Sequence, residues 1–287
     1  MYTIENYKEC KRFNSVYAEI RSFLQIYADG NYNEHFHWGR FDWMMSHPEL
    51  DVEMLSMIAL FRDKSGRIAG IVMFDTDMDN RWYILHSTSD ESLLGQMIEY
   101  IFKIDGEGTS IKANLNDYVL CKMLENIGFE KRFKESVLEM KLPIKLTGHL
   151  PAGYSFNAPD SIIDDWQWRL VIHRGFENDG IPQVLNEEAA EAEKHLENDE
   201  YIKVFAIKDG EYVAHCGIWY NSGETAYIEP VVTIPEHRCK GLAKAVVYEA
   251  MNRARVRGAK RAIVLSDKEF YLRIGMFQSS EIAKWVK

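Results

Sequence analysis

The sequence predicts an α+β protein made of two units that follow the same order of elements. In both halves, β-branched and aromatic runs are separated by short turn sequences, as in meanders of antiparallel strands. Two prolines and two glycines fall within residues 141–153, a density typical of a linker. We therefore expect an internal duplication, with units at 1–142 and 154–287 joined by a linker at 143–153.

The C-terminal half has the clearer pattern. Turn sequences at 208–211 and 221–224 separate three apolar runs, and residues 242–257 place small and apolar side chains on one helical stripe before Gly258. The expected elements are helices at 160–176 and 186–197, strands at 201–207, 212–220 and 225–234, a helix at 242–257, a strand at 261–266, a short helix at 269–274 and a strand at 282–286.

The N-terminal half repeats this order with a diverged sequence. Its last helix ends in Asn126-Ile127-Gly128-Phe129, which parallels Arg273-Ile274-Gly275-Met276-Phe277 at the end of the second half. The expected elements are helices at 7–28 and 35–45, strands at 55–61, 68–74 and 82–85, a helix at 91–102, a strand at 110–113, a helix at 117–126 and a strand at 137–142.

Composition limits the class of function. The chain has 287 residues, is 46% apolar and carries a net charge of −10. Residues 1–145 hold 17 basic and 23 acidic side chains (−6), and the rest hold 17 and 21 (−4). Neither half is a basic module, so we expect no nucleic-acid partner. The four cysteines form no metal or disulfide pattern, and no signal peptide or membrane span is visible. The expected location is cytoplasmic, without a membrane partner.

The segment that carries chemistry follows the strand at 225–234. Arg238, Lys240 and Gly241 lie in a short loop that leads directly into a helix. Amides at a helix N-terminus lack intrahelical partners, and the helix dipole favours an anion there. A glycine lets the backbone approach a phosphate closely. Because neither a dinucleotide-binding nor a P-loop motif is present, another phosphate-bearing ligand is indicated.

This segment resembles the GNAT superfamily of acyl-CoA-dependent N-acetyltransferases. The family signature appears as Thr233-Ile234-Pro235, then Arg238-Cys239-Lys240-Gly241-Leu242-Ala243, then Tyr271 four residues before Gly275. Ala243 and Cys239 replace commoner glycines, and Met276 separates Gly275 from Phe277. The resemblance implies two tandem GNAT-like domains, each a mostly antiparallel mixed sheet flanked by helices, with acetyl-CoA as the co-substrate.

The resemblance also implies how the co-substrate is held. The strand residues Val231, Val232 and Thr233 would lie along the pantetheine arm, and the Val231 amide would face the thioester oxygen. The pyrophosphate would bind the loop and first helical turn, which comprise Arg238, Cys239, Lys240, Gly241, Leu242, Ala243 and Lys244.

Two side chains are candidates for proton transfer. Tyr271 matches the family's general acid, and a tyrosine pKa near 10 is close enough to a thiol pKa near 8.5 for donation to the leaving sulfur. The alternative is a core aromatic. Glu229 is the candidate base, two residues before Val231 and so expected on the same strand face. The alternative is an outward-facing strand carboxylate. His215 is a secondary candidate, although a lone strand histidine is more often structural.

The N-terminal half lacks this chemistry. Its corresponding loop, 86–91, has no arginine or glycine, and Thr88 with Glu91 fits a capping box that satisfies the helix start internally. Leu124 stands where Tyr271 stands in the second half. We infer a degenerate unit that packs on the catalytic one and shapes the acceptor pocket. The aromatic segment 34–45 indicates packing rather than a metal site, because its two histidines share no helix face.

The function expected is acetyl transfer from acetyl-CoA to a primary amine by direct attack in a ternary complex. A non-catalytic acyl-CoA sensor or interaction module is the alternative from another class. An aminoacyl-tRNA-dependent transferase also pairs two GNAT-like units, but the acidic charge of both halves speaks against it. The acceptor, a small molecule or a peptide amine, is open, and so is the oligomeric state, a homodimer included.

Overall fold

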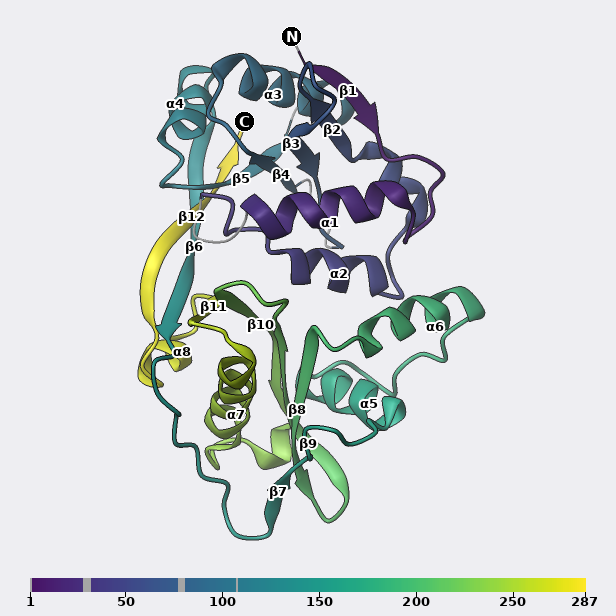
Figure 1. Cartoon of the computed structure of the whole chain (residues 1–287), viewed down its shortest axis with the longest axis vertical. Coiled ribbons are helices and arrows are strands. Elements are labelled where there is room, and N and C mark those ends of the chain that lie inside the picture. The colour runs from purple at the N-terminus through teal and green to yellow at the C-terminus, as the bar shows by residue number, and fades with distance from the viewer. Residues whose placement is uncertain (1, 28–31, 77–80, 107) are drawn as a thin grey trace.

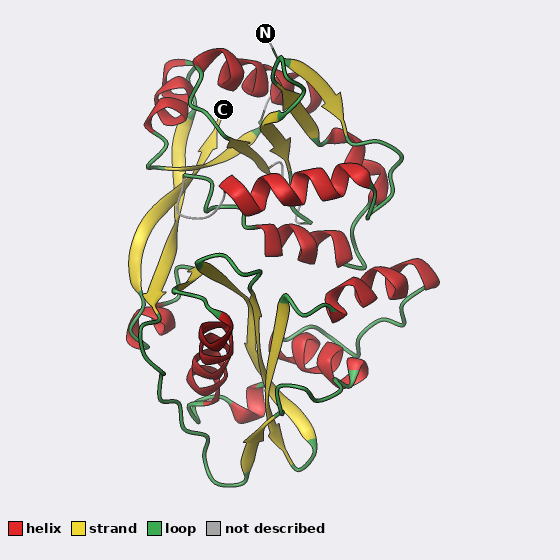
Figure 2. Cartoon of the chain, in the orientation of Figure 1, coloured by secondary structure: helices red, strands yellow, loops and turns green. Residues whose placement is uncertain are grey.

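The computed structural model describes residues 2–27, 32–76, 81–106 and 108–287 (Figures 1 and 2). The N-terminal half holds the expected order of elements. In chain order these are β1 (Thr3–Asn6), α1 (Ser15–Tyr27), α2 (Trp38–Ser46), the 3-10 turn η1 (Val52–Met57), β2 (Ala59–Arg62), β3 (Ile68–Met73), β4 (Arg81–His86), α3 (Glu91–Asp105), β5 (Ser110–Asn114), α4 (Tyr118–Asn126) and β6 (Glu130–Lys141).

The C-terminal half repeats that order. It comprises β7 (Tyr154–Phe156), α5 (Asp165–Gly175), α6 (Glu187–Lys194), η2 (His195–Glu197), β8 (Tyr201–Lys208), β9 (Glu211–Trp219), β10 (Thr225–Thr233), η3 (Pro235–His237), α7 (Leu242–Arg257), β11 (Arg261–Leu265), α8 (Glu269–Arg273) and β12 (Phe277–Val286).

The strands of the described residues join into one sheet of twelve, in the order β1-β2-β3-β4-β5-β12-β6-β11-β10-β9-β8-β7. Two pairs, β4 with β5 and β10 with β11, are parallel, and the other pairs are antiparallel. The expected α+β class with mixed, mostly antiparallel sheets is therefore confirmed.

The two halves exchange their last strands. β12 lies between β5 and β6, so Ala283 pairs with Ala113 on one side and Lys134 on the other. β6 in turn pairs with β11 through Leu138 and Val264. Each half therefore completes its sheet with a strand from the other. Figure 1 shows these two long strands crossing between the halves.

Helices cover both faces of the sheet and also meet between the halves. In the C-terminal half α7 lies on one face and α5 with α6 on the other (Figure 1). α2 contacts α1, α6 and η2. At this junction Trp38 packs edge to face on Trp219, with ring centroids 5.9 Å apart. A Cβ on Gly39 would lie 2.3 Å from the Trp219 side chain, so glycine allows this close approach.

Several elements differ from the sequence prediction. β1 and β7 are strands of four and three residues, too short to leave a pattern. The first helix begins at Ser15 rather than Tyr7, and its predicted last residue, Ala28, lies outside the described residues. β6 has twelve residues instead of six, because its polar, exposed first half pairs with β12. Within the described ranges, no helix has the length and apolar character needed to cross a membrane.

Candidate active site

The centre of the C-terminal half is the point where β10 and β11 separate. They pair in parallel only from Thr225–Tyr227 to Arg261–Ile263. Beyond Tyr227, β10 continues to Thr233, and within the described residues its one paired neighbour there is β9. The edge of β10 that faces β11 is therefore open where Val231 and Thr233 lie.

A bulge in β10 changes which face these residues occupy. Ile228 pairs with Ile218, and Val231 pairs with Cys216, so β10 has one extra residue between them. Ile228 and Val231 consequently face the same side, opposite to Tyr227. The expectation that Glu229 and Val231 share a face is wrong, because it assumed unbroken alternation. The carboxylate of Glu229 stays with Tyr227, whose hydroxyl donates to it at 2.6 Å.

The loop after β10 leads to a helix start that no side chain caps. Gly241 has φ +82° and precedes α7, and the first turn of α7 receives no side-chain hydrogen bond. In the described part of the chain, every other α-helix of at least eight residues begins with a side chain that accepts from a first-turn amide. Those side chains are Asn14, His37, Asp90, Asp117, Asp164 and Asn186. The amides of α7 are thus left for an outside acceptor.

An elongated cleft of about 750 Å³ joins the open strand edge to this helix start, a size in the usual range of ligand sites. Of the residues predicted to hold or act on acetyl-CoA, two do not line the cleft: Lys240, whose ammonium donates to the Glu236 carbonyl at 2.9 Å, and Glu229. The lining residues that were predicted are Val231, Val232, Thr233, Arg238, Cys239, Gly241, Leu242, Ala243, Lys244 and Tyr271.

Sequence reasoning missed several residues of the cleft wall. Lys268 and Arg273 flank Tyr271, and their spacing around it was a signal that could have suggested them. The end of α5 and the turn after it also line the cleft through Gly175, Phe176 and Glu177. No local signal marks these three, because more than fifty positions separate them from Val231 on the open edge of β10.

Arg238 is held at the mouth of the cleft. Its guanidinium donates to the Thr233 carbonyl at 3.1 Å and to the Gly175 carbonyl at 2.9 Å, and it forms an ion pair with Glu177. The ion pair is exposed, so it contributes little to stability. It does place a cation where the loop meets α5.

Tyr271 lies in α8, is 6% exposed and lines the cleft. Burial raises its pKa above the ordinary value, and the nearby Cys216 and Glu229 add to that rise. The phenol is therefore protonated throughout the neutral range and can act as a proton donor. The difference between the pKa of Tyr271 and that of a free thiol is therefore larger than the ordinary values used in the sequence analysis indicate.

Glu229 lies against the N-terminal half. Burial raises the pKa of its carboxyl, and the Arg40 guanidinium and the Tyr227 hydrogen bond oppose that rise. Arg40, on α2, donates through Nε to Asp75 Oδ2 at 2.6 Å. The His37 ring stacks on Tyr227, with centroids 4.8 Å apart. The N-terminal half thus contributes charged and aromatic groups beside the candidate base.

His215 is a core residue. It is fully buried on β9, with Nδ1 3.1 Å from the Val204 carbonyl and its ring stacked on Phe205. Burial lowers its pKa to about 3, so the ring is neutral at physiological pH. It does not line the cleft, and the structural interpretation of this histidine holds.

The corresponding opening in the N-terminal half is closed. β4 and β5 pair from Arg81–Tyr83 to Ser110–Lys112 and then diverge, as β10 and β11 do. Across the divergence, His86 Nε2 lies 2.5 Å from Asp117 Oδ2, and both side chains are buried. The ring of Tyr32 stacks on His86 at 4.5 Å. Side chains thus fill the position that is a cleft in the other half.

The helix start of that half is also occupied. Asp90 accepts from the amides of Ser92 and Leu93 at 2.7 and 3.3 Å. The predicted capping box of Thr88 and Glu91 is wrong in its residues, because the N-cap is Asp90 and α3 begins two residues later than that motif requires. The physical consequence is the one expected: a carboxylate already satisfies these amides and would repel a phosphate.

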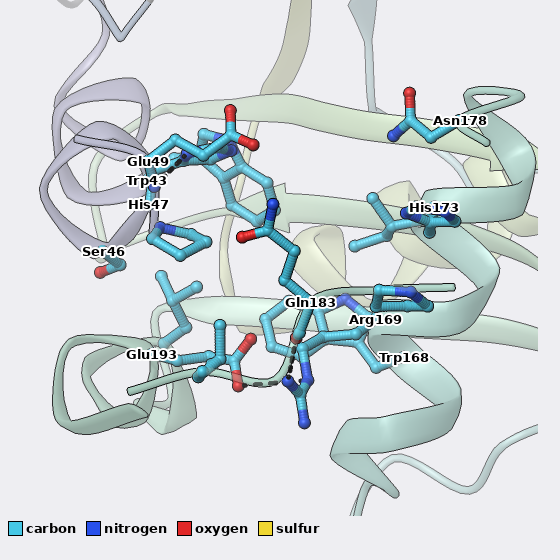
Figure 3. Close-up of a pocket in the computed structure, with 15 residues that line it drawn as sticks. Trp43, Ser46, His47, Glu49, Trp168, Arg169, His173, Asn178, Gln183 and Glu193 are labelled. Atoms are coloured by element: carbon cyan, nitrogen blue, oxygen red, sulfur yellow. Dashed lines mark hydrogen bonds and ion pairs between the residues drawn. The ribbon is translucent and has the colours of Figure 1, made fainter. Parts of the chain in front are cut away.

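A second cavity, of about 380 Å³, lies between the end of α2 and the α5–α6 region (Figure 3). Trp43, His47 and Glu49 line one side, and His173 and Asn178 the other. Arg169 pairs with Glu193 at 3.7 Å. The rings of Trp43 and Trp168 both lie against Tyr201. A Cβ on Gly217 would lie 2.3 Å from the Tyr201 hydroxyl and 2.5 Å from the Glu229 carbonyl oxygen, so Tyr201 packs against this part of the sheet. An aromatic layer therefore separates this cavity from β10.

The aromatic segment 34–45 forms core and interface. Phe36, Phe41, Met44 and Met45 are fully buried, and burial lowers the pKa of His35 to about 4. Among the described residues, no group of three or more histidine, cysteine or acidic side chains is placed to hold a metal. The burial of Phe36, Phe41, Met44 and Met45 confirms the packing interpretation.

Comparison with known proteins agrees with this geometry. Residues 164–276 match the family model of the acetyltransferase (GNAT) family. No curated protein matches the sequence. Solved structures of similar fold include the following three. The tandem GNAT protein from the clavulanic acid biosynthesis pathway has TM-score 0.60 at 11% identity, covering 100% of this chain and 98% of that one. A GCN5-related N-acetyltransferase from Sphaerobacter thermophilus has TM-score 0.58 at 15% identity, covering 100% and 95%. Another from Kribbella flavida has TM-score 0.54 at 18% identity, covering 77% and 88%.

The chain therefore has the tandem GNAT fold. Its C-terminal half contains a GNAT-family acetyltransferase domain, which includes the open strand edge, the uncapped helix start and Tyr271.

Proposed function

We propose that this protein transfers an acetyl group from acetyl-CoA to a primary amine by direct attack in a ternary complex. The observation that carries the proposal is the cleft itself. It joins an open strand edge at Val231 and Thr233 to the uncapped N-terminus of α7. This combination suits a ligand with an extended amide-bearing arm and a pyrophosphate at one end.

The residues of the loop and first helical turn would bind the pyrophosphate. Gly241 has no atom within 4 Å of the position a Cβ would take, so its backbone is approachable. The amides of α7 would donate to phosphate oxygens, and Arg238 would add charge at the mouth. Val231 and Thr233 would pair with the pantetheine arm as an added strand does.

Bound acetyl-CoA would supply an activated acetyl thioester. Glu229 would accept a proton from the incoming ammonium, directly or through a water, so that the neutral amine can form the new C–N bond. The Val231 amide would donate to the carbonyl oxygen as negative charge develops there. Tyr271 would donate its proton to the sulfur as the C–S bond breaks, and the second proton lost by the amine nitrogen as the amide forms would restore the phenol. The bulge in β10 puts Glu229 and Val231 on opposite faces of the strand. The amine would therefore reach the thioester carbon from the face of β10 that carries Glu229.

The direct test is calorimetric titration of the full chain with acetyl-CoA, beside Gly241→Glu. We expect one site per chain, abolished by the new carboxylate. Gly66→Glu is a matched control, since Gly66 also has φ +82° and no atom near its Cβ position. Binding lost in both variants would point to backbone strain, and two sites per chain would contradict the closed N-terminal half.

Turnover separates the enzyme from the alternative of a non-catalytic acyl-CoA sensor. Release of CoA in the presence of a panel of polyamines, amino acids, aminoglycosides and peptides supports the enzyme. Tight binding of acetyl-CoA without release for any amine would favour the sensor.

A further inference from the structure

The junction between the halves holds a charged group that the transfer chemistry described above does not use. Arg40 projects from α2 of the N-terminal half and is 19% exposed. Its guanidinium is anchored by Asp75, to which Nε donates at 2.6 Å and with which Nη2 also pairs. The same guanidinium interacts with the Tyr227 hydroxyl and with Glu229.

We propose that Arg40 is a positioning residue for acetyl transfer: anchored by Asp75, its guanidinium favours the ionised form of the Glu229 carboxylate and, together with Tyr227, orients it. Arg40 would not contact the thioester or the amine. Only the description of Glu229 as a base rests on the proposed function, because the arrangement of these four side chains does not depend on it.

Geometry supports a chain of fixed contacts. Asp75 is buried, and its carboxylate accepts from two nitrogens of the guanidinium, Nε and Nη2, which restricts the rotation of the Arg40 side chain. Tyr227 is buried beneath the His37 ring, and its hydroxyl donates to Glu229 Oε2 at 2.6 Å. The carboxylate therefore has a fixed donor from β10 and a fixed cation from α2.

Charge supports the same role. The charged groups that act on Glu229 are Arg40 on α2, Asp75 after β3 and Glu135 on β6. Three phenols also interact with it: Tyr227 on the same strand, Tyr201 on β8 and Tyr271 on α8. Arg40 and the Tyr227 hydrogen bond favour the ionised form, whereas Asp75 and Glu135 disfavour it. Glu135 is itself paired with Lys112 at 2.9 Å. Arg40 is thus the cation that offsets both the burial of Glu229 and the neighbouring acids.

The test measures the titration of Glu229 itself. Glutamate side chains are labelled with carbon-13 at Cδ, and the Glu229 signal is assigned by its loss in Glu229→Gln. We expect Arg40→Met to raise the titration midpoint by about one pH unit or more, since an opposite charge at close range has an effect of that size. Arg40→Lys should raise it less. Asp75→Asn should lower it, because it removes a neighbouring negative charge while the amide oxygen of asparagine can still accept from the guanidinium and hold it.

Arg62→Met is the matched control. Arg62 is also ion-paired in the N-terminal half, with Glu5 at 2.7 Å, and is 17% exposed, but it lies away from β10. Its substitution should leave the Glu229 midpoint unchanged. The opposite signs for Arg40→Met and Asp75→Asn are a signature that loss of packing would not produce.

An unchanged midpoint in Arg40→Met, or a rise in Asp75→Asn, would overturn the inference. If Arg40→Met does not fold, the direction in which Arg40→Lys and Asp75→Asn shift the Glu229 midpoint still tests the inference. In an active protein the acid limb of kcat/KM should move with the midpoint. Absence of turnover in the wild type would refute the proposed function and leave the titration result standing.

Discussion

His86 Nε2 and Asp117 Oδ2 lie 2.5 Å apart where β4 and β5 diverge. The corresponding position in the C-terminal half is the open cleft. His86 Nδ1 lies 2.9 Å from the Thr88 carbonyl, which can only accept, so Nδ1 carries a hydrogen. A proton must also lie between Nε2 and the carboxylate. This buried contact links the two strands that would otherwise separate.

Breaking that contact should destabilise the protein without opening a second site. Asp117→Asn should lower the free energy of unfolding by about 3 kcal/mol, because it leaves a buried histidine without its charged partner. Because asparagine can still cap α4, the decrease in the free energy of unfolding measures the loss of the His86–Asp117 contact and not the loss of the cap. Urea denaturation measures the change, and calorimetry should still give one acetyl-CoA site, since Asp90 continues to cap α3. Asp105→Asn, whose partner is the neutral Trp82 indole, should have a smaller effect.

Tyr271→Phe should reduce turnover while acetyl-CoA still binds. Removing a general acid costs about 100-fold or more in kcat, and phenylalanine preserves the buried ring. Steady-state kinetics and calorimetry on the same samples make the comparison. Tyr248→Phe is the control, because that hydroxyl bonds the Ile274 carbonyl beside α8 without lining the cleft. Wild-type turnover in Tyr271→Phe would mean that this tyrosine is only a core aromatic.

The exchanged strand should make the two halves unfold together. Ala283 is fully buried and central in β12, with partners on both β5 and β6. Ala283→Pro should cost about 3 kcal/mol or more, since proline removes a ladder donor and does not fit a central strand. We expect wild type and variant each to unfold in one transition, with tryptophan fluorescence and far-UV circular dichroism coincident. Two separate transitions in the wild type would show that the halves are independent.

His215 should make the fold sensitive to acid. Its pKa is lowered to about 3 in the folded protein, whereas an unfolded histidine titrates near 6.5. Between those values the unfolded chain binds more protons, so the free energy of unfolding falls as pH falls through that window. Between pH 7 and pH 5, His215→Gln should remove about 2 kcal/mol of this loss. His149→Gln, at an exposed site, should behave as the wild type does. An unaltered pH dependence in His215→Gln would contradict the assignment.

Much of the fold was predictable because its signals are local. The turn sequence at 208–211 fixes the hairpin of β8 and β9, and Asp209 and Gly210 both adopt the positive φ that such a turn needs. The exchange of β6 and β12 left no such signal. A strand pattern at 282–286 indicates which side chains face the core, but the same pattern suits any neighbouring strand.

The candidate site also combines features that have a local sequence signal with features that have none. The loop from Arg238 to Gly241 was predictable, because its spacing alone implies an anion site at a helix start. The bulge at Ile228–Val231 was not, because it arises from the pairing of β10 with β9. Arg40 and Asp75 were also missed. They reach Glu229 only after the halves pack together, and nothing in their local sequence marks them.

The strand exchange also sets an order for the synthesis of the protein. β6 is made long before β12, yet β5 and β6 are neighbours only through β12. During translation the edges of β5 and β6 that pair with β12 therefore stay unpaired until residues 277–286 have left the ribosome. Exposed strand edges invite pairing with other chains. β12 is the last strand of this sheet to be synthesised. Its arrival therefore decides whether the N-terminal half of the nascent chain completes its sheet or aggregates.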